Sequence, residues 1–482
     1  MRFPCSADVG VGFGKLTAPC LRRRLWLLVV VGAFLIGSLT PATNVHAAEF
    51  QQPPVDEPTT VRTADPCISG DPYDLDALRR AISADPPPTA PVTINRYLTV
   101  RYVATGELSD EPVGEPADPA PDDPGVTDPE ERPADTVPVQ DTLLHVFNTA
   151  TRHEFAINMN RNMLAEIHQC RIQAGLTSAT EGLDDPSALE ELRMLFLPVV
   201  QRMGNGGLHA DSDLVQSAAR SNGIDTRIIR TPTTSWPWRT ISHFSNNCTG
   251  TLIGPRHLIT AAHCINQQGT NTWFSFTVSP GRDGSTFPYG SSTISPNPAP
   301  GQTAWYFTHP QWRNPNTTNP RQWDWGLIVI PDRLGDQTGW MGYVALTATT
   351  LKANNQYNRG YPACGGTRPD VPVNCQPQRL YGDTATCGLG SFRFPGPDNW
   401  NRIFNHSCDT SGGHSGSPIY QYFFDSKLGK TVPVVDAVHV ASECDGGGNS
   451  PVCGPLDFYP SVARRTTPGD LTVISWLREV FP

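Results

Sequence analysis

The stretch C-T-G-T-L-I-G-P-R-H-L-I-T-A-A-H-C, residues 248–264, contains two short apolar runs with glycine and proline between them, and it ends in a histidine beside a cysteine. Short runs broken by turn residues are typical of β-strands. A disulfide from Cys264 to Cys248 would hold His263 at a braced corner. A general base requires such a fixed imidazole, because a misplacement of about 1 Å can cost on the order of 100-fold in rate. For this histidine taken alone, a buried residue with satisfied hydrogen bonds is the alternative.

A second stretch, D-T-S-G-G-H-S-G-S-P at residues 409–418, places a serine between glycines. A serine hydroxyl attacks only after a base removes its proton, and the developing oxyanion needs converging backbone N–H groups. Glycines permit backbone geometry that residues with a Cβ resist. Ser415 is therefore the candidate nucleophile, and the amides of Gly413 and Ser415 form the candidate oxyanion hole. A Gly/Ser-rich surface turn is the alternative for this stretch alone.

A carboxylate lies between these two stretches, in W-D-W-G-L-I-V-I at residues 323–330. Asp324 stands at the mouth of an apolar strand, where a charge persists only if it is paired, and an imidazole N–H is a suitable partner. Asp332 and Asp336 are the competing carboxylates, although P-D-R-L-G-D around Asp332 is typical of an exposed turn. A base, its orienter and a nucleophile are the minimum set for acyl transfer by a serine hydrolase.

Outward from these motifs, the chain from about residue 221 onward consists of short β runs broken by glycine, proline and asparagine. The clearest runs are R-T-I-S-H-F, G-T-L-I-G, H-L-I-T-A-A, W-F-S-F-T-V, W-G-L-I-V-I and V-P-V-V-D-A-V-H-V. Regular short strands with turn signals predict an all-β sandwich or barrel. The sequence D-L-T-V-I-S-W-L-R-E-V-F predicts a C-terminal helix with Asp470 as its N-cap.

The order His, Asp, Ser, with T-A-A-H-C at the base, resembles the chymotrypsin-like (trypsin-like) serine peptidases. The segments V-S-P-G-R-D-G-S-T-F-P-Y-G, Q-W-D-W-G-L-I and A-V-H-V bring the resemblance close to the bacterial glutamyl endopeptidases, over roughly residues 221–482. This resemblance implies an all-β fold of two antiparallel six-stranded β-barrels with the site in the cleft between them. It implies His263 as base and acid, Asp324 as orienter and Ser415 as nucleophile of a serine endopeptidase that works through an acyl-enzyme.

The resemblance also implies a pocket for Glu or Asp at P1. In the Glu-specific group a histidine at the position of His439 pairs with the substrate carboxylate, and a hydroxyl at the position of Thr410 completes the contact. Ser442 is a third candidate for this pocket. A histidine can carry charge near neutral pH, as recognition of a carboxylate requires. Asp409, six residues before Ser415, favours the alternative of Arg or Lys at P1, since trypsin-type enzymes select those side chains with an aspartate at that spacing.

The residue before the nucleophile is His414, where trypsin-like enzymes have an aspartate that pairs with a new N-terminal amine. A histidine cannot do this, so activation must work differently, and we expect His414 to be an outward-pointing loop residue. A catalytically silent homologue that acts as a binding module is the alternative to an enzyme, although every triad residue is present. An esterase-type α/β hydrolase does not fit, because there the nucleophile precedes the histidine in the chain.

The chain has 482 residues and a net charge of -10. Its length allows two or three domains, and its charge argues against a nucleic-acid surface. Three arginines precede an apolar stretch at residues 25–39, and V-H-A follows, which is typical of a secretory signal peptide over residues 1–47. We therefore expect a secreted, extracellular monomer that acts on protein or peptide substrates without stable membrane association. A retained membrane anchor is the alternative.

Residues 48–140 are expected to be a pro-region. Its Pro/Asp/Glu-rich part, residues 106–139, cannot bury enough apolar surface to offset chain entropy and predicts a disordered linker. Residues 141–220 carry apolar positions at roughly helical spacing and a capping-box pattern at Ser187, so we expect two helices and a helical part of the propeptide there.

Residues 221–482 are the expected peptidase domain, and cleavage after Arg220 would release it. The part before this join is expected to be a propeptide that keeps the enzyme inactive or assists its folding. A retained accessory domain formed by residues 141–202 is the alternative.

Twelve cysteines fit an exported protein. Eight of them follow residue 240, and an even number predicts four disulfides. Pairing between nearest neighbours is the working hypothesis, with Cys248–Cys264 as the bond we would defend. A zinc site is the alternative, but the sequence has no C-x-x-C pair and no H-x-x-x-H helix, so we expect no metal and no cofactor.

Overall fold

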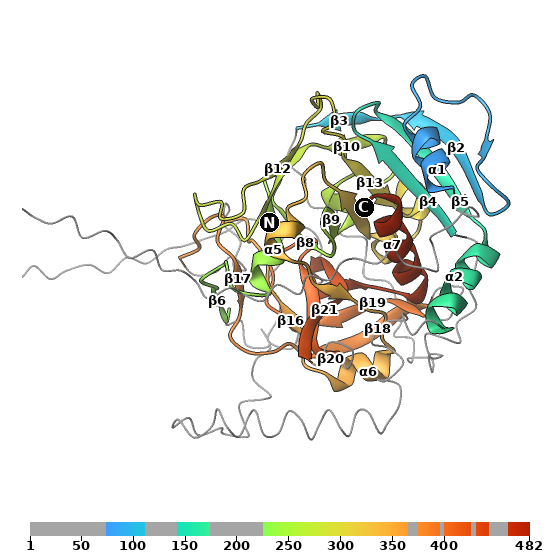
Figure 1. The fold of residues 1–482 in the computed structure, drawn as a ribbon. Helices are drawn as coiled ribbons and strands as arrows, with labels where there is room; N and C mark the ends of the chain where they lie inside the picture. Colours follow the sequence, from blue (N-terminus) through green and yellow to red (C-terminus); the bar gives the residue numbers. More distant parts are fainter. Residues whose placement is uncertain are drawn as a thin grey trace, which may run out of the picture. The chain divides into compact units, whose positions relative to one another are not determined.

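Strands account for more of the described residues than helices do (Figure 1). The computed structural model describes residues 74–110, 142–173, 225–364, 372, 374–395, 400–425, 430–442 and 461–482. The expected signal peptide, most of the expected linker, the expected helix at Ser187 and the last two cysteines lie outside the described residues. Among the helices of the described part, none has both the length and the apolar character to cross a membrane.

The first large sheet has eleven strands in the order β1-β2-β5-β4-β13-β14-β9-β8-β7-β11-β12. Seven of them follow residue 225: β7 (Ile241–Phe244), β8 (Cys248–Leu252), β9 (His257–Thr260), β11 (Phe276–Pro280), β12 (Ser292–Ile294), β13 (Trp305–Thr308) and β14 (Gly326–Val329). Strands β7, β8 and β9 form a consecutive antiparallel meander, and β14 returns from much later in the chain to pair with β9. This return brings two of the sequence motifs to the same end of the sheet.

The second large sheet has seven strands, in the order β16-β20-β21-β22-β19-β18 with β15 paired to β21. Its strands are β15 (Gly342–Tyr343), β16 (Tyr357–Asn358), β18 (Leu389–Pro395), β19 (Asn401–His406), β20 (Pro418–Asp425), β21 (Lys430–Ser442) and β22 (Ser461–Arg465). Two small sheets pair β6 (Arg227–Ile229) with β17 (Tyr381–Asp383), and β3 (Glu107–Ser109) with β10 (Thr272–Phe274). The short helices are η5 (Trp238–Thr240), η6 (Ala262–Cys264), α4 (Pro310–Arg313), η7 (Pro320–Trp323), α5 (Gly335–Thr338) and α6 (Ala348–Ala353).

The segment expected to be helical begins instead as a β-hairpin. Strands β4 (Thr142–Asn148) and β5 (His153–Met159) pair antiparallel, and they continue through β2 (Leu98–Thr105) to β1 (Val92–Thr93). The helical prediction for the start of residues 141–220 was therefore wrong. All but one residue of β5 is buried, so the strand lacks the alternation that distinguishes a strand from a buried helix. The helix of this region, α2, is Arg161–Gln173.

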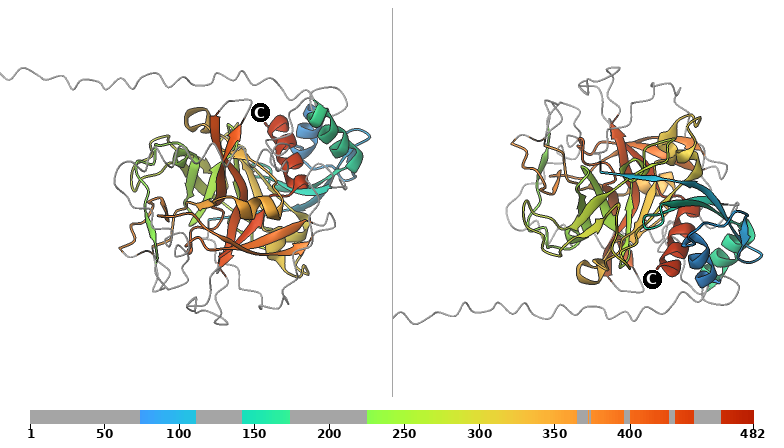
Figure 2. Two further views of the ribbon diagram at one scale, coloured as in Figure 1. Left: turned by 90° about the horizontal axis from the view of Figure 1, so that it is seen from below. Right: turned by 90° about the horizontal axis from the view of Figure 1, so that it is seen from above.

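Three helices lie side by side at the end of the first sheet. They are α1 (Leu75–Ile82), α2 and the C-terminal α7 (Pro468–Val480), and the views of Figure 2 agree on their proximity. The C-terminal helix was predicted correctly, but its N-cap was not. Thr467 is the cap and accepts from the amide of Asp470, whose carboxylate accepts in return from the amide of Thr467. Asp470 is thus the third helical residue of a capping box.

One hydrophobic cluster joins the N-terminal segment, the first sheet and the terminal helix. It contains Phe147 from β4, Ile259 from β9 and Leu477 from α7, all fully buried. A separate cluster under the second sheet includes Phe392 and Phe404. The N-terminal segment and the first sheet therefore share a core.

The capping box of α7 generates a stability prediction. Thr467→Ala should lower the free energy of unfolding by about 1 kcal/mol, because it leaves the Asp470 amide without its acceptor. Thr467→Ser keeps the hydroxyl and should lose only a few tenths of that. Denaturant unfolding of both variants measures the difference. Equal losses would show that the methyl group, rather than the cap, supplies the stability.

Candidate active site

His263 and Asp324 make a two-point contact. One carboxylate oxygen accepts from the backbone N–H of His263 at 2.9 Å, and the other lies 2.6 Å from its Nδ1. Both side chains are buried. A carboxylate on Nδ1 fixes the tautomer that leaves Nε2 as the proton acceptor.

Strand pairing brings these two residues together. β9 leads into η6, which carries His263, and Asp324 is the C-cap of η7, just before β14 begins. Gly326 of β14 pairs with Thr260 of β9 at the end of their ladder. Asp324 and His263, which lie two and three residues beyond this pair, therefore come close together. Trp323, beside Asp324, stacks on His309 with ring centroids 4.0 Å apart. The sequence predicts that Asp324 lies at the start of an apolar strand and is shielded from water. Its side chain is indeed almost fully buried.

The loop carrying Ser415 is tied to the first sheet by Thr249 of β8. The amide of Thr249 donates to the carbonyl oxygen of Ser415 at 2.8 Å, and its hydroxyl donates to that of Gly413 at 2.8 Å. The Sγ of Cys264 lies 3.5 Å from the Ser415 carbonyl oxygen. These contacts place Ser415 beside the residue that follows His263. Sequence reasoning had missed Thr249, because nothing in a single sequence links a strand threonine to a loop far along the chain.

The same loop is tied to the second sheet by β21. The amide of Gly416 donates to the carbonyl oxygen of His439 at 2.8 Å, and the amide of His439 donates to that of Ser417 at 2.9 Å. The loop therefore bridges the two sheets, with Ser415 between them.

Two glycines of this loop occupy positions that another residue could not. Gly413 and Gly416 have φ of 96° and 80°. A Cβ on Gly413 would lie 2.4 Å from the Tyr361 carbonyl oxygen, and one on Gly416 would lie 2.3 Å from that of Thr249. Within the described residues neither the Gly413 nor the Ser415 amide donates a hydrogen bond, so both predicted oxyanion-hole donors are available to a ligand.

The hydrogen bond from the candidate nucleophile to the candidate base is not formed. Among the described residues the buried Nε2 of His263 has no hydrogen-bond partner. Ser415 is half-buried. In ligand-free enzymes this contact is often long and tightens when substrate binds.

His439 and Thr410, the residues predicted to line the pocket, are buried. Nδ1 of His439 lies 3.3 Å from Nε2 of His406, and Oγ1 of Thr410 lies 2.8 Å from Oγ of Ser461. Ser442 ends β21, and its side chain lies outside the described residues.

His406 and Ser461 were missed from the sequence. His406 ends β19, a strand that is buried throughout, and nothing in its local sequence indicates a second histidine opposite it. Burial lowers the pKa of His406 to about 3. Burial, and then the neighbouring His406 and His414, hold the pKa of His439 well below its ordinary value. Both imidazoles are therefore neutral at neutral pH in the ligand-free site.

Asp409 is turned toward the N-terminal end of the described peptidase segment. Its Oδ2 accepts from the amide of Thr226 at 2.7 Å and from the Thr226 hydroxyl at 3.0 Å. Its own amide donates to the carboxylate of Asp383 at 3.1 Å. Burial raises the pKa of both carboxyl groups, and the charge of Asp409 raises that of Asp383 further.

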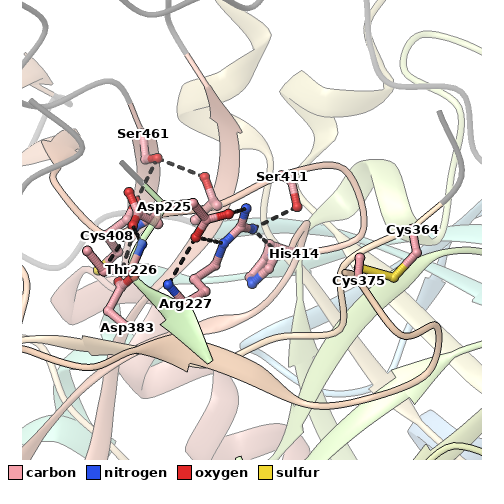
Figure 3. A network of polar contacts seen from close by, with 12 residues as sticks. Asp225, Thr226, Arg227, Cys364, Cys375, Asp383, Cys408, Ser411, His414 and Ser461 are labelled. Carbon is pink, nitrogen blue, oxygen red and sulfur yellow. Dashed lines mark hydrogen bonds and ion pairs between the residues drawn. A yellow bond between two sulfur atoms is a disulfide. The ribbon is translucent and has the colours of Figure 1, made fainter. Parts of the chain in front are cut away.

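His414 does not point outward, contrary to the sequence-based prediction. It is fully buried, and Figure 3 shows it beside the guanidinium of Arg227. Arg227 donates to both carboxylate oxygens of Asp225 and, at 2.7 Å, to the Ser411 hydroxyl, and its Nη1 lies 3.5 Å from Nδ1 of His414. Burial, and then the charge of Arg227, lower the pKa of His414 well below its ordinary value. A buried, neutral His414 thus packs beneath the loop that carries Ser415.

Three of the four predicted nearest-neighbour disulfides are confirmed: Cys248–Cys264, Cys364–Cys375 and Cys387–Cys408. Two groups of side chains in the described residues lie close enough to suggest metal ligands, Cys248 with His263 and Cys264, and Asp383 with Cys387 and Cys408. Their sulfurs are already paired in disulfides, so they lack the thiolate that binds a metal.

The strand-rich fold and the sequence motifs resemble those of the chymotrypsin-like serine peptidases, close to the glutamyl endopeptidases. Residues 227–356 match the family model described as Trypsin. A glutamyl endopeptidase of Bacillus licheniformis is 31% identical over 223 residues, which cover 45% of this chain and 59% of that protein. The predicted resemblance and the chymotrypsin-like all-β fold class are confirmed.

A protein named extracellular metalloprotease, from Bacillus subtilis, is 27% identical over 215 residues, which cover 42% of this chain and 58% of that protein. The chain therefore spans less than two thirds of the length of either relative. Among solved structures, a Glu endopeptidase is 18% identical at a TM-score of 0.38, covering 54% of this chain and 99% of its own.

The close approach at Gly416 generates a second prediction. Gly416→Ala should lower the free energy of unfolding by roughly 3 kcal/mol or more, since it adds a backbone clash to the strain of a positive φ. Gly301→Ala is the matched control, because Gly301 has a φ of 82° and nothing within 4 Å of its added Cβ. That control should lose only about 1–2 kcal/mol. Equal destabilisation in denaturant unfolding would contradict the close packing of this loop.

Proposed function

We propose that this chain is a serine endopeptidase that cuts peptide bonds through His263, Asp324 and Ser415. The observation that carries the proposal is the two-point contact of Asp324 with His263, made beside a serine loop whose Gly413 and Ser415 amides are free of other hydrogen bonds in the described residues. A buried carboxylate on Nδ1 has no structural need of a half-buried serine in a loop that contacts the neighbouring Cys264, whereas acyl transfer needs a carboxylate, an imidazole and a serine together.

In the proposed mechanism the Ser415 hydroxyl attacks the scissile carbonyl carbon while Nε2 of His263 takes its proton. The Asp324 carboxylate stabilises the imidazolium, and the amides of Gly413 and Ser415 donate to the oxyanion. His263 then gives the proton to the leaving amine as the C–N bond breaks. Water attacks the resulting acyl-enzyme by the same route, which restores the Ser415 hydroxyl and releases the acid.

We further propose a preference for Glu, or Asp, at P1. His439 lies in the backbone ladder that holds the nucleophile loop, close to where the P1 side chain would enter. His406 supports it by contacting its Nδ1, which leaves Nε2 for the substrate carboxylate. The name of the relative from Bacillus licheniformis agrees with this specificity.

Selection of Arg or Lys by Asp409 is the second candidate. Oδ2 of Asp409 already accepts two hydrogen bonds from Thr226, and burial raises the pKa of the carboxyl group, which weakens it as a partner for a substrate cation. These contacts favour the acidic preference.

Secretion as an extracellular monomer, with a signal peptide over residues 1–47 and a maturation cut near Arg220, completes the proposal. The disulfides support it, because such bonds persist in oxidising compartments. The only macromolecular contacts that the activity requires are protein or peptide substrates.

Covalent labelling tests the nucleophile. A fluorophosphonate should label Ser415, and Ser415→Ala should lose the label and at least about 10⁴-fold of the peptidase rate. Ser391→Ala removes an exposed serine of β18, whose hydroxyl contacts Asn405, and should keep both. A wild-type protein that is folded but unlabelled would favour the silent binding module instead.

The specificity proposal makes a pH-dependent prediction. The free His439 is neutral across about pH 6 to 8, so pairing with a Glu carboxylate that stays ionised requires proton uptake. The ratio of kcat/KM for matched Glu and Gln peptides should therefore rise as pH falls, by up to about tenfold per unit. Both peptides share the triad, so its titration cancels.

His439→Ala should make this ratio small and independent of pH. A flat ratio in the wild-type protein would refute the charged-histidine pocket. Cleavage of only Arg or Lys peptides, abolished by Asp409→Asn, would establish the second candidate.

A further inference from the structure

The N-terminal segment, defined here as residues 74–173, continues the first sheet of the peptidase domain. β4 pairs with β13 from Asn148 opposite Trp305 to His145 opposite Thr308. The other edge of β13 is covered by β14. Without β4, β13 would present an open row of backbone donors and acceptors, an arrangement that folded proteins rarely leave exposed.

Phe147 of β4 inserts into the aromatic core of the peptidase domain. Its ring stacks on Trp273 at a centroid distance of 4.7 Å and an interplanar angle of 5°, and on Tyr306 at 6.3 Å. All three rings are fully buried. Removal of the segment would leave a cavity the size of a phenyl ring and expose two large aromatic side chains to water.

A buried ion cluster joins the same two parts. Glu154 of β5 is fully buried and accepts from Nη2 of Arg313 at 2.6 Å and from its Nε at 3.0 Å. Nδ1 of His145 lies 2.5 Å from the same carboxylate. Burial would raise the pKa of Glu154, but the hydrogen bonds from His145 and Arg313 lower it below its ordinary value. Breaking a buried pair leaves an uncompensated charge, so this contact opposes separation.

Two further contacts extend the shared surface. The Thr149 amide donates to the carbonyl oxygen of Ala304 at 3.1 Å, and the Ala304 amide donates to the Thr149 hydroxyl at 2.9 Å. Arg79 of α1 donates to the carbonyl oxygen of Val480 at the end of α7. The first helix of the described chain, α1, is thus hydrogen-bonded to the last, α7.

These contacts avoid the catalytic residues. Within the described residues, no hydrogen bond or ion pair joins the N-terminal segment to His263, Asp324 or Ser415. A segment that only blocked the site would need contacts there, whereas this one has a strand pairing, an aromatic insertion and a buried ion pair elsewhere.

We propose that residues 74–173 remain bound to residues 225–482 after the chain between them is cut, as a second chain that completes the first sheet of the mature protein. The proposal rests on the proposed maturation cut near Arg220, but not on the proposed peptidase activity. It replaces a released propeptide with a permanent partner made from the same gene product.

The test uses the full chain with Ser415→Ala, which cannot cut itself, and with a site for a foreign sequence-specific protease inserted between residues 174 and 224. Cys170 is disulfide-bonded, so Cys170→Ser is included to exclude a covalent tether. After cutting, gel filtration should recover both pieces together in equal amounts, even after dilution to about nanomolar concentration. Separate elution of the pieces would overturn the proposal, whether or not the larger piece stays folded.

Two substitutions then test the contacts. Glu154→Gln and the milder Phe147→Leu should each increase the rate of release of the segment by at least about tenfold. Glu107→Gln makes the same charge change on an exposed side chain of the segment and should leave the rate within about twofold. Equal release rates for all three would overturn the proposal. Fluorophosphonate labelling of the cut chain with Ser415 intact tests activity separately, so that its failure would count against the proposed function and not against retention.

Discussion

The contact between the Asp324 carboxylate and His263 is the constraint on which the site depends. Two separate donors of one residue, a backbone amide and a ring nitrogen, fix both the position and the orientation of the imidazole. A single hydrogen bond would leave the ring free to rotate. The contact exists only because β14 pairs with β9 in a register that sets Gly326 opposite Thr260. A slip of one residue would reverse the facing of the side chains and separate the pair.

The nucleophile depends on a second constraint, the junction of the two sheets. Thr249 holds the Ser415 loop from the first sheet, and His439 holds it from the second. Neither sheet alone positions the serine, so the chemistry requires both to be folded. The glycines in the loop are a consequence of this close fit, because backbone atoms from each side fill the space that a Cβ would need. His439 contributes both a backbone support and a candidate pocket side chain, which couples specificity to nucleophile position.

Local motifs were enough to propose candidate site residues, whereas contacts that depend on long-range strand pairing could not be predicted from the sequence. His263, Asp324 and Ser415 could be proposed because each stands in a short pattern of strand and turn residues. The strand β5 could not, since burial on both faces removes the alternation that marks a strand. The outward orientation predicted for His414 was wrong because residues far earlier in the chain, Arg227 and Gly360, pack against its ring. The N-cap of α7 was predicted three residues too late, at Asp470 instead of Thr467, because both residue types occur in a capping box.

The N-terminal segment belongs to the same sheet as β14, the strand that follows Asp324. β4 supports β13, β13 supports β14, and β14 begins just after Asp324. If β4 left, β13 would become an edge strand, and edge strands open more readily than internal ones. Only β13 and β14 separate this new edge from Asp324, so opening of the edge would affect the position of Asp324. The Ser415 loop would keep its hydrogen bonds to Thr249 and His439. Retention of the segment therefore bears on how firmly His263, the proposed base, is held against Asp324.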